Sequence, residues 1–112
     1  MINTTLGDVL RDIEIFSWNE CVYLKIEEQF APSTPCLVIN DNEAELGMDD
    51  FTPVEAEKRD MQEFLSIQDL RGVVKNLEHF QTDPAIETKC AAAAYYFKND
   101  AFMPKSAEPG VS

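Results

Sequence analysis

The fold is decided by the stretch ECVYLKIEE (residues 20–28), together with the shorter stretch CLVIN (residues 36–40). The side chains of the first stretch fall into two alternating sets, which are Val22, Leu24 and Ile26 on one side and Cys21, Tyr23 and Lys25 on the other. This two-residue period is typical of a strand with one buried and one solvated face. CLVIN is almost wholly apolar and predicts a second strand. Because two prolines interrupt FAPSTP (30–35) between them, we expect the two strands to pair antiparallel.

Helices are predicted before and after this pair of strands in the sequence. Thr4 or Thr5 can cap a first helix that extends to Phe16, since apolar residues follow at three- and four-residue spacing. The buried face of that helix would consist of Leu6, Val9, Leu10 and Ile13. Farther along, Pro53 suits the first turn of a short helix that Thr52 would cap.

Two longer helices are predicted in the second half of the chain. Ser66 and Asp69 resemble a capping box that opens a helix to about Phe80. Asp83 and Pro84 indicate the start of the last helix, as a cap followed by proline at the first helical position. The expected fold class is therefore α+β, with a short antiparallel β-hairpin or small sheet packed with three to four helices.

Length and composition indicate one domain. At 112 residues with 45% hydrophobic residues, the chain is long enough to form one core. We expect a single globular α+β domain over residues 1–103, followed by a disordered tail, PKSAEPGVS (104–112), which has no apolar periodicity. The N-terminus lacks the pattern of a signal peptide, and no apolar run approaches the length of a membrane span, so a cytoplasmic protein is expected.

Charge is the strongest signal in the sequence. The chain carries 21 acidic and nine basic residues, a net charge of −12, and half of that charge falls within residues 41–60. Nucleic acids and anionic membranes are poor direct partners, because both require clusters of Lys and Arg. A basic protein is the natural complement of the stretch DNEAELGMDD (41–50).

No catalytic or metal-binding motif emerges. An EF-hand loop beginning at Asp41 fails at its sixth position, which is Leu46, and at its twelfth, which is Thr52. His79 is the only histidine, and its place near a predicted helix end suits a structural role. The wide spacing of three cysteines, Cys21, Cys36 and Cys90, favours buried reduced thiols over disulfides or a zinc site. We therefore expect no enzyme activity, no cofactor and no metal.

Aromatic residues offer candidate contacts. Trp18 precedes the first strand, and Tyr95, Tyr96 and Phe97 follow one another on the last helix; we expect such residues more often in a core or at its rim than in a binding site. Successive helical side chains turn by about 100°, so at least one of Tyr95 and Tyr96 should be partly exposed. An exposed tyrosine near acidic groups is typical of an interface anchor.

The segments QDLRGVVKNL (68–77) and AYYFKNDAF (94–102), together with small size and acidity, resemble the immunity proteins of bacterial polymorphic toxin and contact-dependent growth inhibition systems. The resemblance covers residues 15–102. It implies a cytoplasmic inhibitor that binds the C-terminal toxin domain of a neighbouring gene product and acts by occlusion.

We therefore expect an immunity protein that neutralises a cognate basic toxin domain, most often a nuclease, by covering its active site or substrate surface. The residues expected to bind this partner are Asp41, Glu43, Glu45, Asp49, Asp50, Glu55, Tyr95 and Tyr96. Three alternatives remain. The acidic stretch could be a solvated loop, the protein could be a DNA-mimic inhibitor of a nucleic-acid enzyme, or it could be a small metabolite-binding domain with an apolar pocket.

Overall fold

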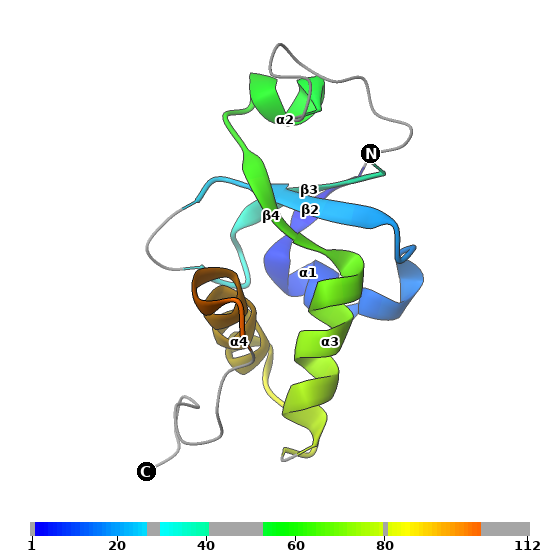
Figure 1. The fold of residues 1–112 in the computed structure, drawn as a ribbon, viewed down its shortest axis with the longest axis vertical. Helices are drawn as coiled ribbons and strands as arrows, with labels where there is room; N and C mark the ends of the chain where they lie inside the picture. The colour runs from blue at the N-terminus through cyan, green and yellow to red at the C-terminus, as the bar shows by residue number, and fades with distance from the viewer. Residues whose placement is uncertain (1, 27–29, 41–52, 80, 102–112) are drawn as a thin grey trace.

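The structure, a computed structural model, describes residues 2–26, 30–40, 53–79 and 81–101. A four-stranded antiparallel sheet combines with helices, which confirms the expected α+β class (Figure 1). The elements in chain order are β1 (Ile2–Thr5), α1 (Leu6–Arg11), the 3-10 helix η1 (Ile13–Ile15), β2 (Glu20–Leu24), β3 (Pro35–Asn40), α2 (Val54–Lys58), β4 (Gln62–Ser66), α3 (Ile67–Glu78) and α4 (Ile86–Asn99). None of the helices in these ranges has the length and apolar character needed to cross a membrane.

The two predicted strands form the centre of the sheet, whose order is β1-β3-β2-β4. β2 and β3 pair antiparallel as expected, with Val22 opposite Val38. The two edge strands were not predicted. β1 is short and mostly polar, and β4 contains an irregularity opposite Val22 and Tyr23 that places Phe64 and Leu65 in the same core cluster. Two consecutive core residues hide the alternation by which a strand is recognised.

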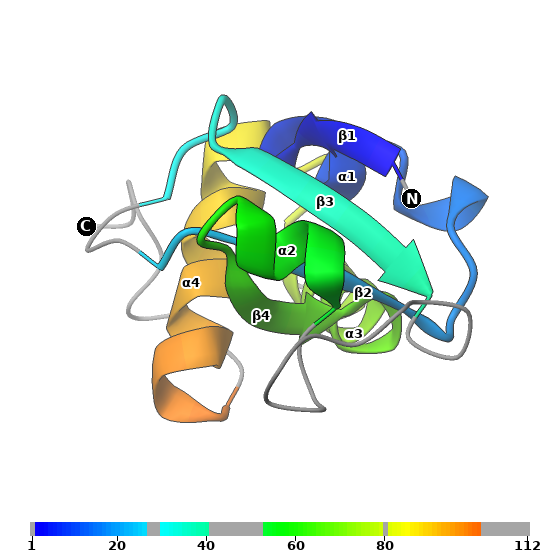
Figure 2. The same cartoon turned by 90° about the horizontal axis from the view of Figure 1, so that it is seen from above.

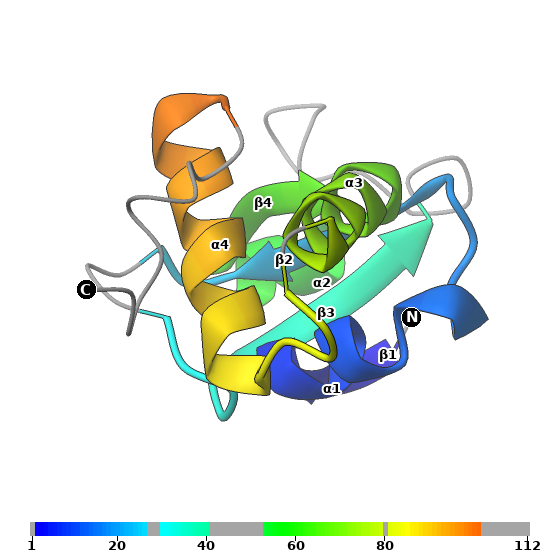
Figure 3. The same ribbon diagram turned by 90° about the horizontal axis from the view of Figure 1, so that it is seen from below.

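Helices cover the two faces of the sheet unequally. α1, α3 and α4 lie against one face, called here the three-helix face (Figures 1 and 3). Of the helices in the described part of the chain, α2 alone lies over the opposite face, called here the α2 face (Figure 2). The main core lies on the three-helix face and includes Val22 and Leu24 of β2 and Val38 of β3. α3 begins at the end of β4 and runs away from the sheet, with α4 beside it.

The side of β2 that faces α2 is buried, which differs from the expected solvated face. The strand was predicted to have one solvated face, yet Tyr23, on the side opposite Val22 and Leu24, is only 3% exposed. Tyr23 packs with Leu37, Ile39 and Ala56, and the last of these belongs to α2. A five-residue helix placed far away in the sequence therefore converts a predicted solvent face into a second, smaller core.

The first helix is capped as predicted but ends early. The Thr5 side chain accepts a hydrogen bond from the Asp8 N–H at 3.3 Å, and α1 ends at Arg11 instead of Phe16. All four residues of its predicted apolar face are buried, because η1 continues to bury Ile13 after α1 has ended. Gly7 is required by close approach, since a Cβ there would lie 2.8 Å from the Cβ of Pro32.

The N-terminal caps of α3 and α4 agree only in part with the prediction. Ser66 caps α3, and its Oγ accepts a hydrogen bond from the Asp69 N–H at 3.0 Å. α4 starts at Ile86, with Ala85 at the N-cap position and no side-chain cap, so the predicted Asp83 cap is wrong. Asp83 has φ 51, a left-handed conformation that belongs to the preceding turn and not to an N-cap.

α2 also begins later than predicted. Pro53 is its N-cap residue with extended ψ, and not its first helical residue. Its predicted cap, Thr52, and the predicted disordered tail, residues 104–112, lie outside the described residues.

Candidate functional site

Five of the residues expected to bind a partner, Asp41, Glu43, Glu45, Asp49 and Asp50, lie outside the described residues. Glu55, the sixth, lies in the first turn of α2, where its carboxylate is 3.9 Å from the ammonium group of Lys58. This pair lies within one helix, three residues apart and largely exposed, so it contributes little to stability. Glu55 therefore remains accessible in part to a partner.

The residue that joins the acidic stretch to the sheet belongs to the described part of the chain. Asn40, the last residue of β3, directly precedes Asp41 and is paired in the sheet with Glu20, the first residue of β2. Glu20 is in turn only two residues from Trp18. The acidic stretch is thus joined to the fold beside the turn that leads into β2.

That turn exposes the largest apolar side chain of the protein. Trp18 is 66% exposed and Ile15, at the end of η1, is 76% exposed. The expectation that Trp18 belongs to a core or its rim is therefore wrong. Monomeric proteins expose single apolar residues routinely, but an exposed tryptophan beside a second exposed apolar residue is characteristic of contact surfaces.

Two reciprocal hydrogen bonds hold the turn that carries Trp18. The Ser17 N–H donates to the Glu20 carboxylate at 2.7 Å, and the Glu20 N–H donates to the Ser17 carbonyl at 3.0 Å. Trp18 lies between these two bonded residues. The backbone of the turn is therefore fixed before any partner arrives, which lowers the conformational entropy lost on binding.

Arg71 holds the residues before the turn from the other side. Its Nη2 donates to the carbonyls of Phe16 and Ile13, the latter at 3.5 Å, and Phe16 is itself buried in the main core. The Nε of Arg71 is buried without a hydrogen-bond partner in the described part of the chain and lies 3.9 Å from the Glu14 carboxylate. The segment Ile13–Glu20, which we call the Trp18 turn, is thus anchored to α3.

One acidic residue within the Trp18 turn is exposed, and another directly precedes the turn. The Glu14 side chain is 77% exposed, and Asp12 lies just before η1 with an ion pair to Arg11 at 3.7 Å. An exposed apolar anchor with acidic residues close by in the sequence complements a partner that has an apolar recess and a basic rim. Trp18 was expected in a core or at its rim because large apolar side chains are usually buried; its polar neighbours in SWN (17–19) are the signal that could have indicated an exposed turn.

Tyr95 and Tyr96, the last two predicted contact residues, are both half-buried, so the expectation of partial exposure is confirmed. Both pack against a small cluster of Val73, Leu77 and Ala92 between α3 and α4. The negative charge of Asp69, with smaller effects from burial, from Asp100 and from a hydrogen bond to Asp69, raises the pKa of Tyr96. The hydroxyl of Tyr96 thus already connects α4 to the first turn of α3. A contact of either tyrosine with a partner stays a prediction.

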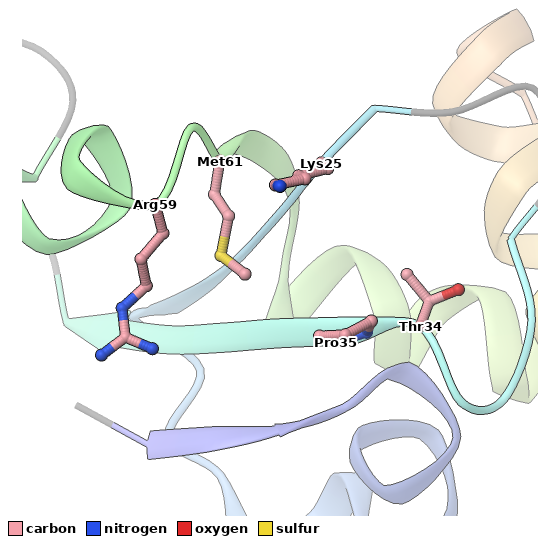
Figure 4. A pocket seen from close by; sticks show the side chains of 5 residues that line it. All are labelled: Lys25, Thr34, Pro35, Arg59 and Met61. Carbon is pink, nitrogen blue, oxygen red and sulfur yellow. The ribbon is translucent and has the colours of Figure 1, made fainter.

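A separate hollow of about 430 Å³ lies on the α2 face, next to the end of α2 (Figure 4). The residues that line it are Lys25, Thr34, Pro35, Arg59 and Met61. They come from the segment after β2, the start of β3 and the segment after α2, so the hollow exists only in the folded chain. It does not include the Trp18 turn or the predicted tyrosines.

Two of the three thiols are buried on the three-helix side of the sheet. Burial, with nearby Asp8 and Cys90, raises the pKa of Cys36 to about 12, and burial and Glu87 raise the pKa of Cys90 to about 11. Both thiols are therefore protonated near neutral pH and poor nucleophiles. His79 is exposed at the C-terminal cap of α3. No group of three metal-ligating side chains occurs among the described residues.

Comparison with known proteins identifies the family. Residues 2–105 match the model of DUF7716, a domain of unknown function, and the chain belongs to that family. No curated protein and no solved structure matches the chain.

Proposed function

We propose that this member of the DUF7716 family is a protein-binding inhibitor of the immunity type, which docks on a cognate basic toxin domain and covers its active site or substrate surface. The observation that carries the proposal is Trp18, exposed on a fixed turn directly beside the attachment of the acidic stretch. Trp18 supplies the apolar anchor and the acidic stretch supplies the charge.

The two features act on different steps of binding. Clustered carboxylates attract a basic partner and raise its association rate, an effect that falls steeply with salt. A tryptophan that enters a recess of the partner mainly lowers the dissociation rate, and tryptophan is among the residues most enriched in interface hot spots. Since the Trp18 turn is already held by Glu20 and Arg71, little ordering is required on binding.

A nuclease is the first candidate for the target. Nuclease sites use Lys and Arg to hold phosphates, and a segment that carries a net charge of −6 over residues 41–60 offers carboxylates that can pair with the same Lys and Arg side chains. Inhibition by occlusion requires no catalytic residue in the inhibitor.

The proposal is tested by capture followed by quantitative binding. The tagged chain is used at low salt to retain a basic protein from its source cells, and the toxin domain encoded upstream is then purified for calorimetry and a growth-protection assay. Trp18→Ala should raise the dissociation constant at least about 30-fold, and charge reversal by Asp49→Lys with Asp50→Lys about tenfold, mainly through slower association.

Glu78→Lys provides the matched control, because Glu78 is exposed at the end of α3 that lies away from the sheet. This variant reverses a charge without touching the Trp18 turn or the acidic stretch, so it should bind and protect like the parent chain. Equal affinity of the parent chain, the Trp18 variant and the charge-reversed variant would contradict the proposal. So would failure of the chain to bind any basic protein.

A further inference from the structure

The hollow beside α2 presents cationic groups in a strongly acidic protein. Lys25 follows β2 directly, and Arg59 is the C-cap residue of α2, 34 positions later. In the described part of the chain neither side chain forms an ion pair, whereas Arg11, Lys58 and Arg71 each lie near a carboxylate. Two of the nine basic residues of a chain with 21 acids therefore face one hollow without a described counter-ion.

The guanidinium group of Arg59 is held in place. Its Nη1 donates to Oδ1 of Asn3 on β1 at 2.7 Å, across the α2 face of the sheet. Asn3 is uncharged, so this hydrogen bond orients the guanidinium without neutralising it. The remaining N–H groups of the planar fork keep the geometry that matches a carboxylate.

The floor of the hollow is apolar. Met61 packs against the small core of the α2 face, and Pro35 begins β3. In Figure 4, Met61 lies between Arg59 and Lys25, and the hydroxyl of Thr34 is turned away from Met61. That hydroxyl accepts a hydrogen bond from the Ala31 N–H at 2.9 Å, so Thr34 presents its methyl group to the hollow. An apolar floor with a cationic rim is the arrangement of sites for amphipathic anions.

We propose that this hollow binds a small organic monocarboxylate, whose carboxylate faces the guanidinium of Arg59 and whose compact apolar body lies against Met61, with the ammonium group of Lys25 on the other side of Met61. The volume of about 430 Å³ is within the range of small-molecule sites. A monoanion is favoured over a phosphate dianion, because the net charge of −12 repels each additional negative charge. The site is independent of the Trp18 turn and of the proposed inhibition.

Benzoate is a suitable probe, titrated into the ¹⁵N-labelled full-length chain at constant ionic strength. We expect saturable shifts of the amide resonances of Lys25, Thr34, Arg59 and Met61, with a dissociation constant of about 1 mM. Benzamide has the same shape without the charge, and acetate has the charge without the apolar body. Both should bind at least about threefold more weakly.

Substitutions then locate the site. Lys25→Gln and Arg59→Gln should each raise the dissociation constant of benzoate at least about threefold, because each removes a charge from the rim. Lys58→Gln is the matched control, since Lys58 lies beside Arg59 in the sequence, is paired with Glu55 and does not line the hollow. It should leave benzoate binding unchanged. All three positions are exposed, and the amide spectrum verifies that each variant is folded.

Three results would overturn the assignment. The first is the absence of a saturable shift at these amides with benzoate at ~10 mM, well above the expected dissociation constant. The second is equal binding of benzamide or acetate, which would mean that charge and apolar body do not act together. The third is an equal loss of affinity in the Lys58 variant, which would indicate adventitious attraction to the overall charge.

Discussion

The two faces of the sheet differ in how completely they are covered. Among the described residues, the main core, on the three-helix face, contains 16 buried residues, whereas the core of the α2 face contains four. Both cores draw on alternating residues of the same strands, β2 and β3. The difference teaches that the two faces contribute unequally to the described core, and that the face with the smaller core also carries the hollow.

The largest expected effect is the loss of a fully buried side chain from the main core. Leu24→Ala should lower the free energy of unfolding by about 3 kcal/mol, since the transfer and cavity costs add. On the α2 face, Met61 is half-buried, and Met61→Ala should cost no more than about 1 kcal/mol. Urea unfolding measures both variants. Equal losses of unfolding free energy in the two variants would contradict the view that the three-helix face contributes more to stability than the α2 face.

The two buried cysteines of the main core should make the free energy of unfolding depend on pH. Burial raises the pKa of Cys36 to about 12 and of Cys90 to about 11, from an ordinary 9.0. Because the raised pKa belongs to the folded state, this contribution to stability is complete below pH 9 and declines as pH rises towards 11 and 12. Each thiol should lower the free energy of unfolding by about 1 kcal/mol between pH 8 and pH 10.

Urea unfolding at pH 8 and pH 10 checks this dependence against a variant with Cys36→Ala and Cys90→Ala. The cavity cost of the substitutions is the same at both pH values and cancels in the comparison. The double variant should lose less stability than the parent chain on this change of pH. Equal losses would show that the buried thiols are not the cause.

A smaller effect is expected at the cap of α3. Ser66→Ala removes the hydrogen bond to the Asp69 N–H and should cost about 1 kcal/mol. Gln68→Ala is the control, since Gln68 is exposed in the same first turn, and it should change stability by less than about 0.5 kcal/mol. Thermal unfolding of the two variants measures the difference. Equal stability of the two variants would mean that the Ser66 cap does not stabilise α3.

The smallest effect on stability is expected at Trp18. Because Trp18 is 66% exposed and its turn is held through backbone groups and Glu20, Trp18→Ala should change the free energy of unfolding by less than about 0.5 kcal/mol. The same variant is expected to weaken partner binding strongly. A large loss of stability would instead assign Trp18 to the fold.

The local features of the fold could be predicted from the sequence. The period of residues 20–24, the apolar run 36–40 and the Ser66 cap are written in neighbouring residues, and each appears in the structure with the expected partner. The apolar face of the first helix was also predicted correctly, although η1 and not α1 completes it. Such signals suffice because strand period and helix capping depend on residues only two to four positions apart.

The candidate sites depended on packing between distant segments. β4 was missed because its irregular pairing places consecutive residues in one core, and Tyr23 was misjudged because Ala56 covers it from α2. The exposure of Trp18 follows from how Arg71 and Glu20 hold its turn, and the hollow follows from bringing Lys25 and Arg59 together.

The sequence by itself determined the α+β class, the central strand pair, the cap at Ser66 and the acidity of the molecule, and it narrowed the first cap to Thr4 or Thr5. Only the tertiary structure decided which face of the sheet is thinly covered and which side chains remain exposed. The physical reason is that burial is a property of what packs against a residue, and in this protein those neighbours come from parts of the chain that no local pattern connects.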